Sequence, residues 1–119
     1  MSREIKFRAW YMPFGSKKPK QEMLHRRASS ILSFAEMNPD AYIVEQFTGL
    51  KDKNGKDVYE GDLLKIKYPF SDNDEIGEVK WSNSDAGFII GNFQFWKVVP
   101  KSVVVGNVHE DKDLLEADK

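Results

Sequence analysis

Cysteine is absent from the chain, and this absence excludes several kinds of chemistry. Without thiols, disulfide bonds, zinc–thiolate sites and cysteine nucleophiles cannot form. A protein without disulfides is suited to a reducing compartment, so we expect it to act inside a cell. Any functional site must therefore use carboxylates, basic groups or aromatic side chains.

Long hydrophobic runs are absent as well. No stretch approaches the roughly 18 apolar residues that span a bilayer. Residues 1–10 carry charges where a signal peptide needs an apolar segment. The sequence thus predicts a protein that stays in the cytoplasm and has no membrane partner.

Motifs that carry catalysis are missing too. The glycines do not follow the spacing of phosphate-binding loops, and His25 and His109 lie in unrelated segments without a partnered nucleophile. The sequence therefore predicts no catalytic, cofactor-binding or metal-binding residue, and a protein that is not an enzyme.

The residues that are present are sufficient for one folded domain. The chain has 119 residues, of which 40% are hydrophobic and 13% aromatic. This length is close to the commonest domain size, so we expect a single domain over residues 1–119.

Short β-strands dominate the expected fold. Residues 4–11 alternate apolar and polar side chains, which is typical of a strand with one buried face. Further strands are expected at residues 42–47, 63–68, 76–81, 88–90, 93–99 and 103–108. Short strands separated by frequent turns favour a small, mainly β, partly barrel-like domain.

Three other segments have different patterns. Prolines and lysines at about residues 13–22 indicate an exposed basic loop. Residues 23–37 fit either a helix or a strand, and a helical turn is expected near residues 28–37. At the C terminus, Asp111 is expected to cap a short helix over about residues 111–117.

The segment Gln46–Asp62 contains the strongest turn signals. Asn54-Gly55 predicts a type I′ hairpin turn, and glycines recur at positions 49, 55 and 61, where we expect positive φ. Asp52 and Asp62 are expected to accept backbone N–H groups and stiffen these turns.

A second interpretation of the same segment is a metal-dependent hydrolase. Its carboxylates would then converge on a hard cation, which prefers oxygen ligands. They are Asp52, Asp57, Glu60 and Asp62. The interleaved lysines 51, 53 and 56 argue against such a site because they neutralise it.

Charge is unevenly distributed although the net charge is −1. Residues 1–27 carry eight basic and two acidic groups, a balance of +6, so the other 92 residues sum to −7. Basic groups together with aromatic strands are typical of nucleic-acid binding, and aromatic residues on both faces of residues 93–98 favour an interface on one of them. The candidate interaction surface comprises Lys17, Lys18, Lys20, Arg26, Arg27, Trp81 and Trp96.

Three stretches, residues 3–10, 46–62 and 105–110, together resemble one family. They read Arg-Glu-Ile-Lys-Phe-Arg-Ala-Trp, then Gln-Phe-Thr-Gly-Leu-Lys-Asp-Lys-Asn-Gly-Lys-Asp-Val-Tyr-Glu-Gly-Asp, then Val-Gly-Asn-Val-His-Glu. In this order and spacing they resemble the YopX family, small proteins encoded by phages and prophages. Tyr11 departs from the acidic residue that often follows the tryptophan. The resemblance implies a mainly β fold, a phage origin and action in the host bacterial cytoplasm, but no activity.

The sequence as a whole favours a non-enzymatic phage accessory protein that binds a host or phage protein, or a second copy of itself as a homo-oligomer. A nucleic-acid-binding module that uses the basic N-terminal segment is the alternative. The metal-dependent hydrolase is the less favoured one.

Overall fold

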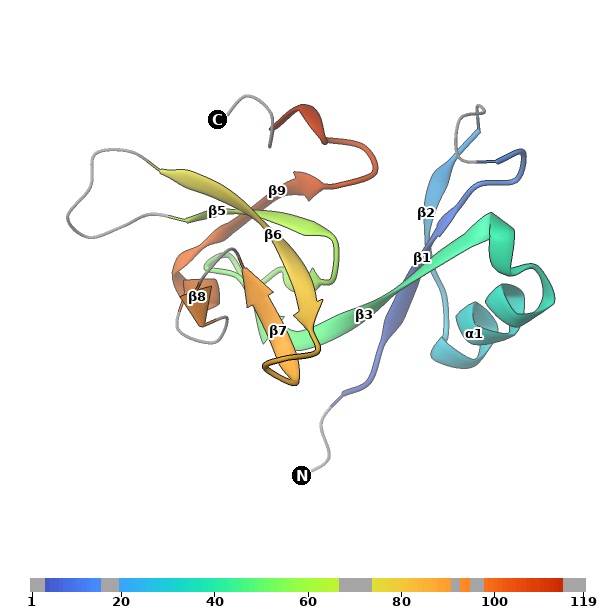
Figure 1. Ribbon diagram of the computed structural model, residues 1–119, viewed down its shortest axis with the longest axis horizontal. Coiled ribbons are helices and arrows are strands. Elements are labelled where there is room, and N and C mark those ends of the chain that lie inside the picture. The colour runs from blue at the N-terminus through green and yellow to red at the C-terminus, as the bar shows by residue number, and fades with distance from the viewer. Residues whose placement is uncertain (1–3, 16–19, 67–73, 91–92, 95–97, 115–119) are drawn as a thin grey trace. The chain divides into compact units, whose positions relative to one another are not determined.

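The structure, a computed structural model, describes residues 4–15, 20–66, 74–90, 93–94 and 98–114 (Figure 1). It divides into two compact units, Met1–Phe47 and Thr48–Lys119, and strand β3 (Tyr42–Lys51) runs from the first into the second. The fold is mainly β, with two antiparallel sheets of which one forms a half-barrel, and this confirms the mainly β, partly barrel-like expectation. The single domain over residues 1–119 stays a prediction.

In the first unit, a sheet forms around its central strand β1. Its elements are β1 (Phe7–Tyr11), β2 (Glu22–His25), α1 (Ala28–Met37), the 3-10 helix η1 (Pro39–Ala41) and the first part of β3. β1 pairs antiparallel with β2 and β3, so that Arg8 lies opposite His25 on one side and opposite Glu45 on the other. The strand expected at residues 4–11 is confirmed from Phe7 onward.

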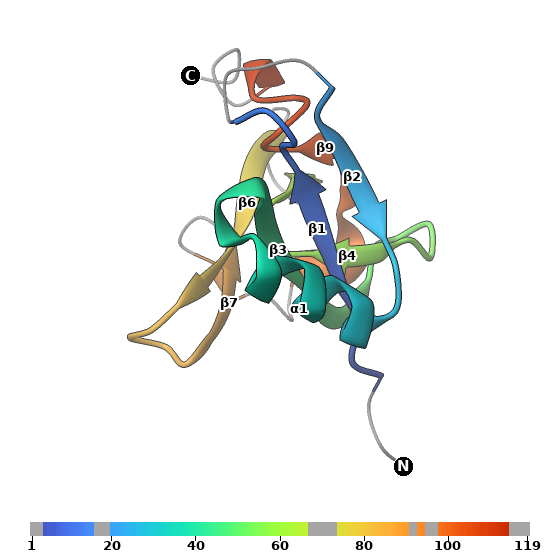
Figure 2. The ribbon, with the colours of Figure 1, turned by 90° about the vertical axis from the view of Figure 1, so that its right-hand side faces the viewer.

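Helix α1 covers one face of this sheet (Figure 2). Ile31 of the helix and Ala9 of β1 are fully buried. The helix ends at Met37, and Pro39 begins η1 two residues later, because proline disfavours helical backbone in the residue before it. The helical turn expected near residues 28–37 is confirmed, whereas residues 23–25 of the same ambiguous stretch belong to strand β2.

In the second unit, the strands form a five-stranded sheet with the order β8-β7-β6-β5-β9. Its elements are β4 (Asp57–Tyr59), β5 (Asp62–Ile66), β6 (Glu75–Ser82), β7 (Gly87–Ile90), β8 (Phe93–Gln94), the 3-10 helix η2 (Val99–Lys101) and β9 (Val103–Asn107). β4 pairs instead with β3. Four buried side chains of the five-stranded sheet form one core with Val58 of β4 and Val99 of η2; they are Leu64, Ile66, Val79 and Ile90.

The predicted C-terminal helix is wrong, because the α-helix in the described part of the chain lies at residues 28–37. Residues 115–117 of the predicted helix lie outside the described residues. Asp111, which we expected to cap that helix, directs its carboxylate upstream, where Oδ2 accepts the N–H of Asn107 at 3.1 Å. The acid therefore closes the turn that follows β9.

Two further expectations need correction. Val99 does not end a strand over residues 93–99 but begins η2, since Pro100 suits the first turn of a helix and cannot donate to a strand ladder; residues 95–97 lie outside the described residues. The hairpin tip is not a type I′ turn, because Gly55 has positive φ and Asn54 does not. Asp52 N–H donates to Lys56 O at 2.9 Å, which makes a wider loop with Gly55 at its left-handed position.

Other turn predictions hold. The glycines at positions 49, 55 and 61 have φ of +91°, +84° and +83°. The N–H of Tyr59 donates to Asp62 Oδ2 at 2.8 Å, as expected of an acid that stiffens a turn. The central segment is thus confirmed as a turn scaffold in outline, although its tip differs from the expected type.

Candidate protein interface

An aromatic surface lies on the first unit where α1 meets the sheet. We define it by Tyr11, Phe34, Met37 and Tyr42. The rings of Tyr11 and Tyr42 stack with their centroids 4.9 Å apart, and the Phe34 ring stacks on Tyr42 at 6.0 Å. Three elements, β1, α1 and β3, therefore contribute to one continuous stack with Tyr42 in the middle.

Two residues of the aromatic surface are clearly exposed. Phe34 is 37% exposed and Met37 is 84% exposed. Met37 follows Phe34 by three residues, so the two side chains lie on neighbouring positions of the helix surface. The flexible thioether of methionine adapts to differently shaped partners, and adjoining exposed apolar side chains mark interaction sites.

Tyr42 gives this surface a neutral hydroxyl group. Burial raises the pKa of the Tyr42 phenol, and the neighbouring Tyr11 raises it further. The phenol therefore stays protonated at neutral pH and can both donate and accept a hydrogen bond. An apolar body with a polar tip is the combination that enriches tyrosine at interfaces.

Sequence reasoning missed the aromatic surface because the conformation of residues 23–37 was left open. A signal was present, since Ile31 and Phe34 have helical spacing and Met37 follows Phe34 by three. In the helix α1, Ile31 lies on the buried side, and Phe34 and Met37 lie on the exposed side next to it. The contact with Tyr42 depends on tertiary packing and has no local signal.

The basic candidates of the first unit lie at the two ends of β2. Lys20 precedes the strand, and Arg26 and Arg27 follow it; all three are exposed. The Nζ of Lys20 lies 6.0 Å from the centroid of the Phe14 ring. Lys17 and Lys18 lie outside the described residues. Arg26 and Arg27 are consecutive in the sequence, and both are exposed on the surface of the first unit.

Trp81 is the aromatic candidate of the second unit that the structure describes. It is 49% exposed on β6. Its Nε1 donates to Asn83 Oδ1 at 2.9 Å, and Phe88 of β7 contacts it edge to face at 5.2 Å. These contacts fix the orientation of the indole ring. Trp96 lies outside the described residues.

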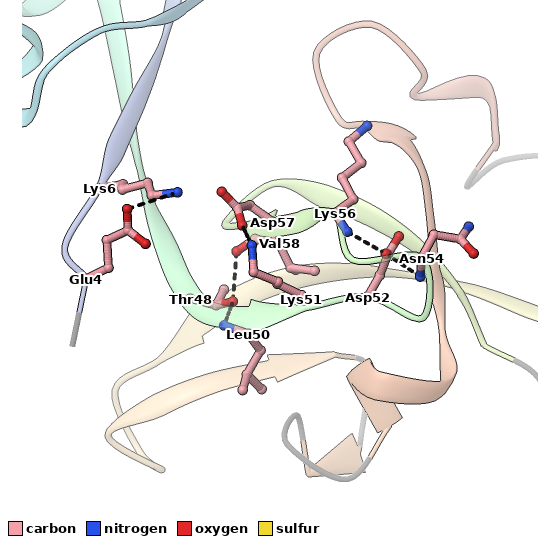
Figure 3. Close-up of polar contacts among 10 residues, drawn as sticks. All are labelled: Glu4, Lys6, Thr48, Leu50, Lys51, Asp52, Asn54, Lys56, Asp57 and Val58. Atoms are coloured by element: carbon pink, nitrogen blue, oxygen red, sulfur yellow. Dashed lines mark hydrogen bonds and ion pairs between the residues drawn. The ribbon is translucent and has the colours of Figure 1, made fainter. Parts of the chain in front are cut away.

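Asp52 organises the hairpin tip of the second unit (Figure 3). Its Oδ1 accepts the N–H of Asn54 at 2.8 Å and the N–H of Lys56 at 2.9 Å. Its Oδ2 accepts the N–H of Val104 in β9 at 2.9 Å. Burial opposes ionisation of this carboxyl, but the three backbone N–H groups and Lys56 outweigh it and lower the pKa of Asp52.

The other acids of this segment do not converge with Asp52. Asp57 pairs with the Nζ of Lys51 at 2.6 Å (Figure 3). Asp62 accepts the N–H of Tyr59 in a separate turn. Within the described ranges, no group of three or more His, Asp or Glu residues is placed to hold a metal ion. Asp52 and Asp62 thus accept backbone N–H groups of two different turns, and Asp57 forms an ion pair with Lys51.

Comparison with known proteins identifies the family. The family described as YopX protein matches residues 6–116, which is almost the whole chain. The chain belongs to the YopX family. This confirms the resemblance that its three sequence stretches carry, and no molecular function is established for the family.

A solved structure shares the fold of this YopX family member. It is the crystal structure of protein EF1440 from Enterococcus faecalis, with a TM-score of 0.60 and 22% identity over 96% of this chain and 99% of that one. No curated protein matches the sequence. Among the described residues, no helix has the length and apolar character needed to cross a membrane.

Proposed function

We propose that this YopX family protein is a phage or prophage accessory protein of the host bacterial cytoplasm that binds a host or phage protein through its aromatic surface and catalyses no reaction. The observation that carries this proposal is the exposure of Phe34 and Met37 beside the Tyr11–Tyr42 stack. The family resemblance supports the phage origin.

Burial of the aromatic surface against a partner removes apolar side chains from water and so favours binding. Fully burying an exposed Phe or Met side chain stabilises by about 1.5–3 kcal/mol. Met37, at 84% exposed, can contribute most of this range, and Phe34, at 37% exposed, contributes a smaller part of it. The ring stack holds Phe34 and Tyr42 in place before a partner arrives, so little side-chain entropy is lost there on binding. Such preordered aromatic anchors beside an adaptable methionine suit a protein interface.

The test compares two substitutions on α1. Met37→Glu introduces a charge into the aromatic surface, and Leu32→Glu is the matched control because Leu32 is also an exposed apolar residue of the same helix, at 42%. Five residues of helix separate them by about 140° around its axis, so Leu32 lies on another side.

Each tagged protein is recovered from infected host cells after nuclease treatment, and the co-purifying proteins are identified. We expect one partner to be retained by the wild type and by Leu32→Glu and lost with Met37→Glu. A partner that Met37→Glu still retains, or recovery of no partner at all, would contradict the proposal.

A second candidate function is nucleic-acid binding, favoured by the adjacent and exposed Arg26 and Arg27. Binding of this kind weakens steeply as salt is added, because phosphate contacts release counterions. Mobility-shift assays with single- and double-stranded DNA and RNA at low salt decide it. No shift with any of them excludes this candidate.

A further inference from the structure

Strand β2 forms an outer edge of the sheet in the first unit. The strand order is β2-β1-β3-β4, so β2 pairs with β1 on one side, and no described strand lies along the other. Such an edge presents backbone N–H and C=O groups to which a strand from another chain can add. The length of β2 and the charges at its two ends determine which strand can pair with this edge.

The two ends of this edge carry opposite charges. Glu22 begins β2 and is exposed; Arg26 follows its last residue and is exposed as well. Arg26 Nη1 donates to the carbonyl oxygen of His25 at 3.1 Å, which holds the guanidinium group at the end of the strand. Half-buried Leu24 lies midway between them in the sequence.

We propose that β2 pairs antiparallel with β2 of a second copy of this chain, about a two-fold axis at Leu24. A two-fold axis perpendicular to the sheet keeps each face continuous across the two copies. Glu22 of each copy then lies opposite Arg26 of the other, and the two Leu24 side chains meet between these ion pairs. The edge is therefore complementary to itself.

Charge also selects the register. If the axis moves to Met23, Lys20 of one copy lies opposite Arg26 of the other, and two like-charge pairs replace the two ion pairs. Like charges directly opposite each other destabilise a strand pair. The axis at Leu24 is thus the arrangement that the charges favour.

The expected dimer is weak. A strand pair of four residues a side is smaller than the roughly 1,200 Å² interface of stable complexes, so association depends on protein concentration. This inference uses the β2 edge rather than the aromatic surface, and either proposal can fail without the other.

The test uses the full chain and sedimentation equilibrium over a range of concentrations. We expect reversible dimerisation of the wild type that weakens as salt is added. Glu22→Arg and Arg26→Glu each create two like-charge pairs and weaken dimerisation by about tenfold or more. Glu36→Arg, an exposed charge reversal on α1, is the control and leaves dimerisation unchanged.

A mixture of Glu22→Arg with Arg26→Glu is decisive. In the mixed dimer, each of the two pairs again joins opposite charges. The association constant of the two variants with each other should therefore return toward the wild-type value, although neither variant dimerises well alone. Circular dichroism melting curves check that all variants fold. A wild type that stays monomeric, a dimer that neither reversal weakens, or a mixture that fails to associate overturns the proposal.

Discussion

Asp52 shows how one buried side chain can determine a loop. The carboxylate is only 6% exposed and accepts three backbone N–H groups from two segments of the second unit. A hydrogen bond to a charged group contributes about 1.5–3 kcal/mol, and a donor left buried without an acceptor costs about 1–3 kcal/mol. Stability of the second unit therefore depends strongly on this acid.

We predict that Asp52→Ala lowers the free energy of unfolding by about 3 kcal/mol, because it removes the acceptor of three N–H groups. Denaturant unfolding at neutral pH measures the change. Lys53→Ala, an exposed residue of the same turn, is the control and should change stability by less than about 0.5 kcal/mol. A loss for Asp52→Ala as small as that of the control would contradict this account.

The same carboxylate makes stability depend on pH. The pKa of Asp52 is lower in the folded chain than its ordinary value of 3.8, so the unfolded chain takes up the proton first as pH falls. The stabilisation is full above pH 3.8 and is lost as pH falls through the folded pKa. Wild type and Asp52→Asn, unfolded at a series of pH values, should differ most above pH 3.8 and converge in acid. A constant difference would show that Asp52 does not titrate in this way.

At the scale of elements, a buried ion pair joins β1 to β3. Arg8 and Glu45 lie directly opposite each other, with Arg8 Nε 2.9 Å from Glu45 Oε1 and both side chains 7% exposed. Removal of one partner of a buried pair leaves an uncompensated charge and costs about 3–5 kcal/mol.

We therefore predict a loss of about 3–5 kcal/mol for Arg8→Met and for Glu45→Leu, measured by denaturant unfolding. The double variant should recover much of this loss, because no charge is left buried. Losses that simply add in the double variant would show that the two residues act independently.

The turn after β9 depends on a close approach. A Cβ atom placed on Gly106 would lie 2.6 Å from Asp111 Cγ and 2.7 Å from its Cβ, which is closer than carbon atoms pack. We predict that Gly106→Ala destabilises the protein by about 1–3 kcal/mol, the usual cost of overpacking.

A double-mutant cycle tests this prediction. Asp111→Gly removes every side-chain atom that the new methyl group would meet, the Cβ included, so Gly106→Ala should cost less in that background. Thermal or denaturant unfolding of the four proteins gives the coupling. If Gly106→Ala lowers the free energy of unfolding equally in both backgrounds, its effect does not come from contact with Asp111.

These elements also show what the sequence can and cannot predict. The strands β1, β6 and β7 and the left-handed glycines follow from local preferences, and they were predicted, whereas β4 was not. At the tip, Asn54-Gly55 predicts a type I′ turn, but Asp52 Oδ1 accepts the N–H groups of Asn54 and Lys56. The Oδ2 atom of Asp52 also accepts the N–H of Val104, a contact 52 residues apart that has no local signal in the sequence. The aromatic surface was missed for the same reason, since Tyr42 meets Phe34 only after the helix packs on the sheet.

At the scale of the whole molecule, the protection of backbone amide hydrogens from exchange with water should differ from strand to strand. β5 pairs with β6 on one side and β9 on the other, and its Leu63 and Leu64 are fully buried. Among the strands that the structure describes, β2 pairs with β1 alone, and it exposes Glu22 and His25. Segments with few buried contacts open at lower free energy than central strands.

We predict that amide hydrogens of β5 exchange most slowly and those of β2 fastest among the strands with described burial. Hydrogen exchange followed by NMR measures this order residue by residue. Dilute protein must be used, so that association at the β2 edge adds no protection. Amide exchange in β5 that is as fast as in β2 would contradict the predicted order.

The contact between Asp52 and Val104 has a consequence for solubility. β9 is the outer strand of its sheet and contains three consecutive valines, a composition that readily recruits identical chains into cross-β stacks. The carboxylate occupies the N–H of Val104, and the N–H of Lys53 occupies the carbonyl oxygen of Ser102. The hairpin tip thus occupies two backbone groups on the outer side of β9, and a strand from another chain cannot pair with these groups while the tip stays in place.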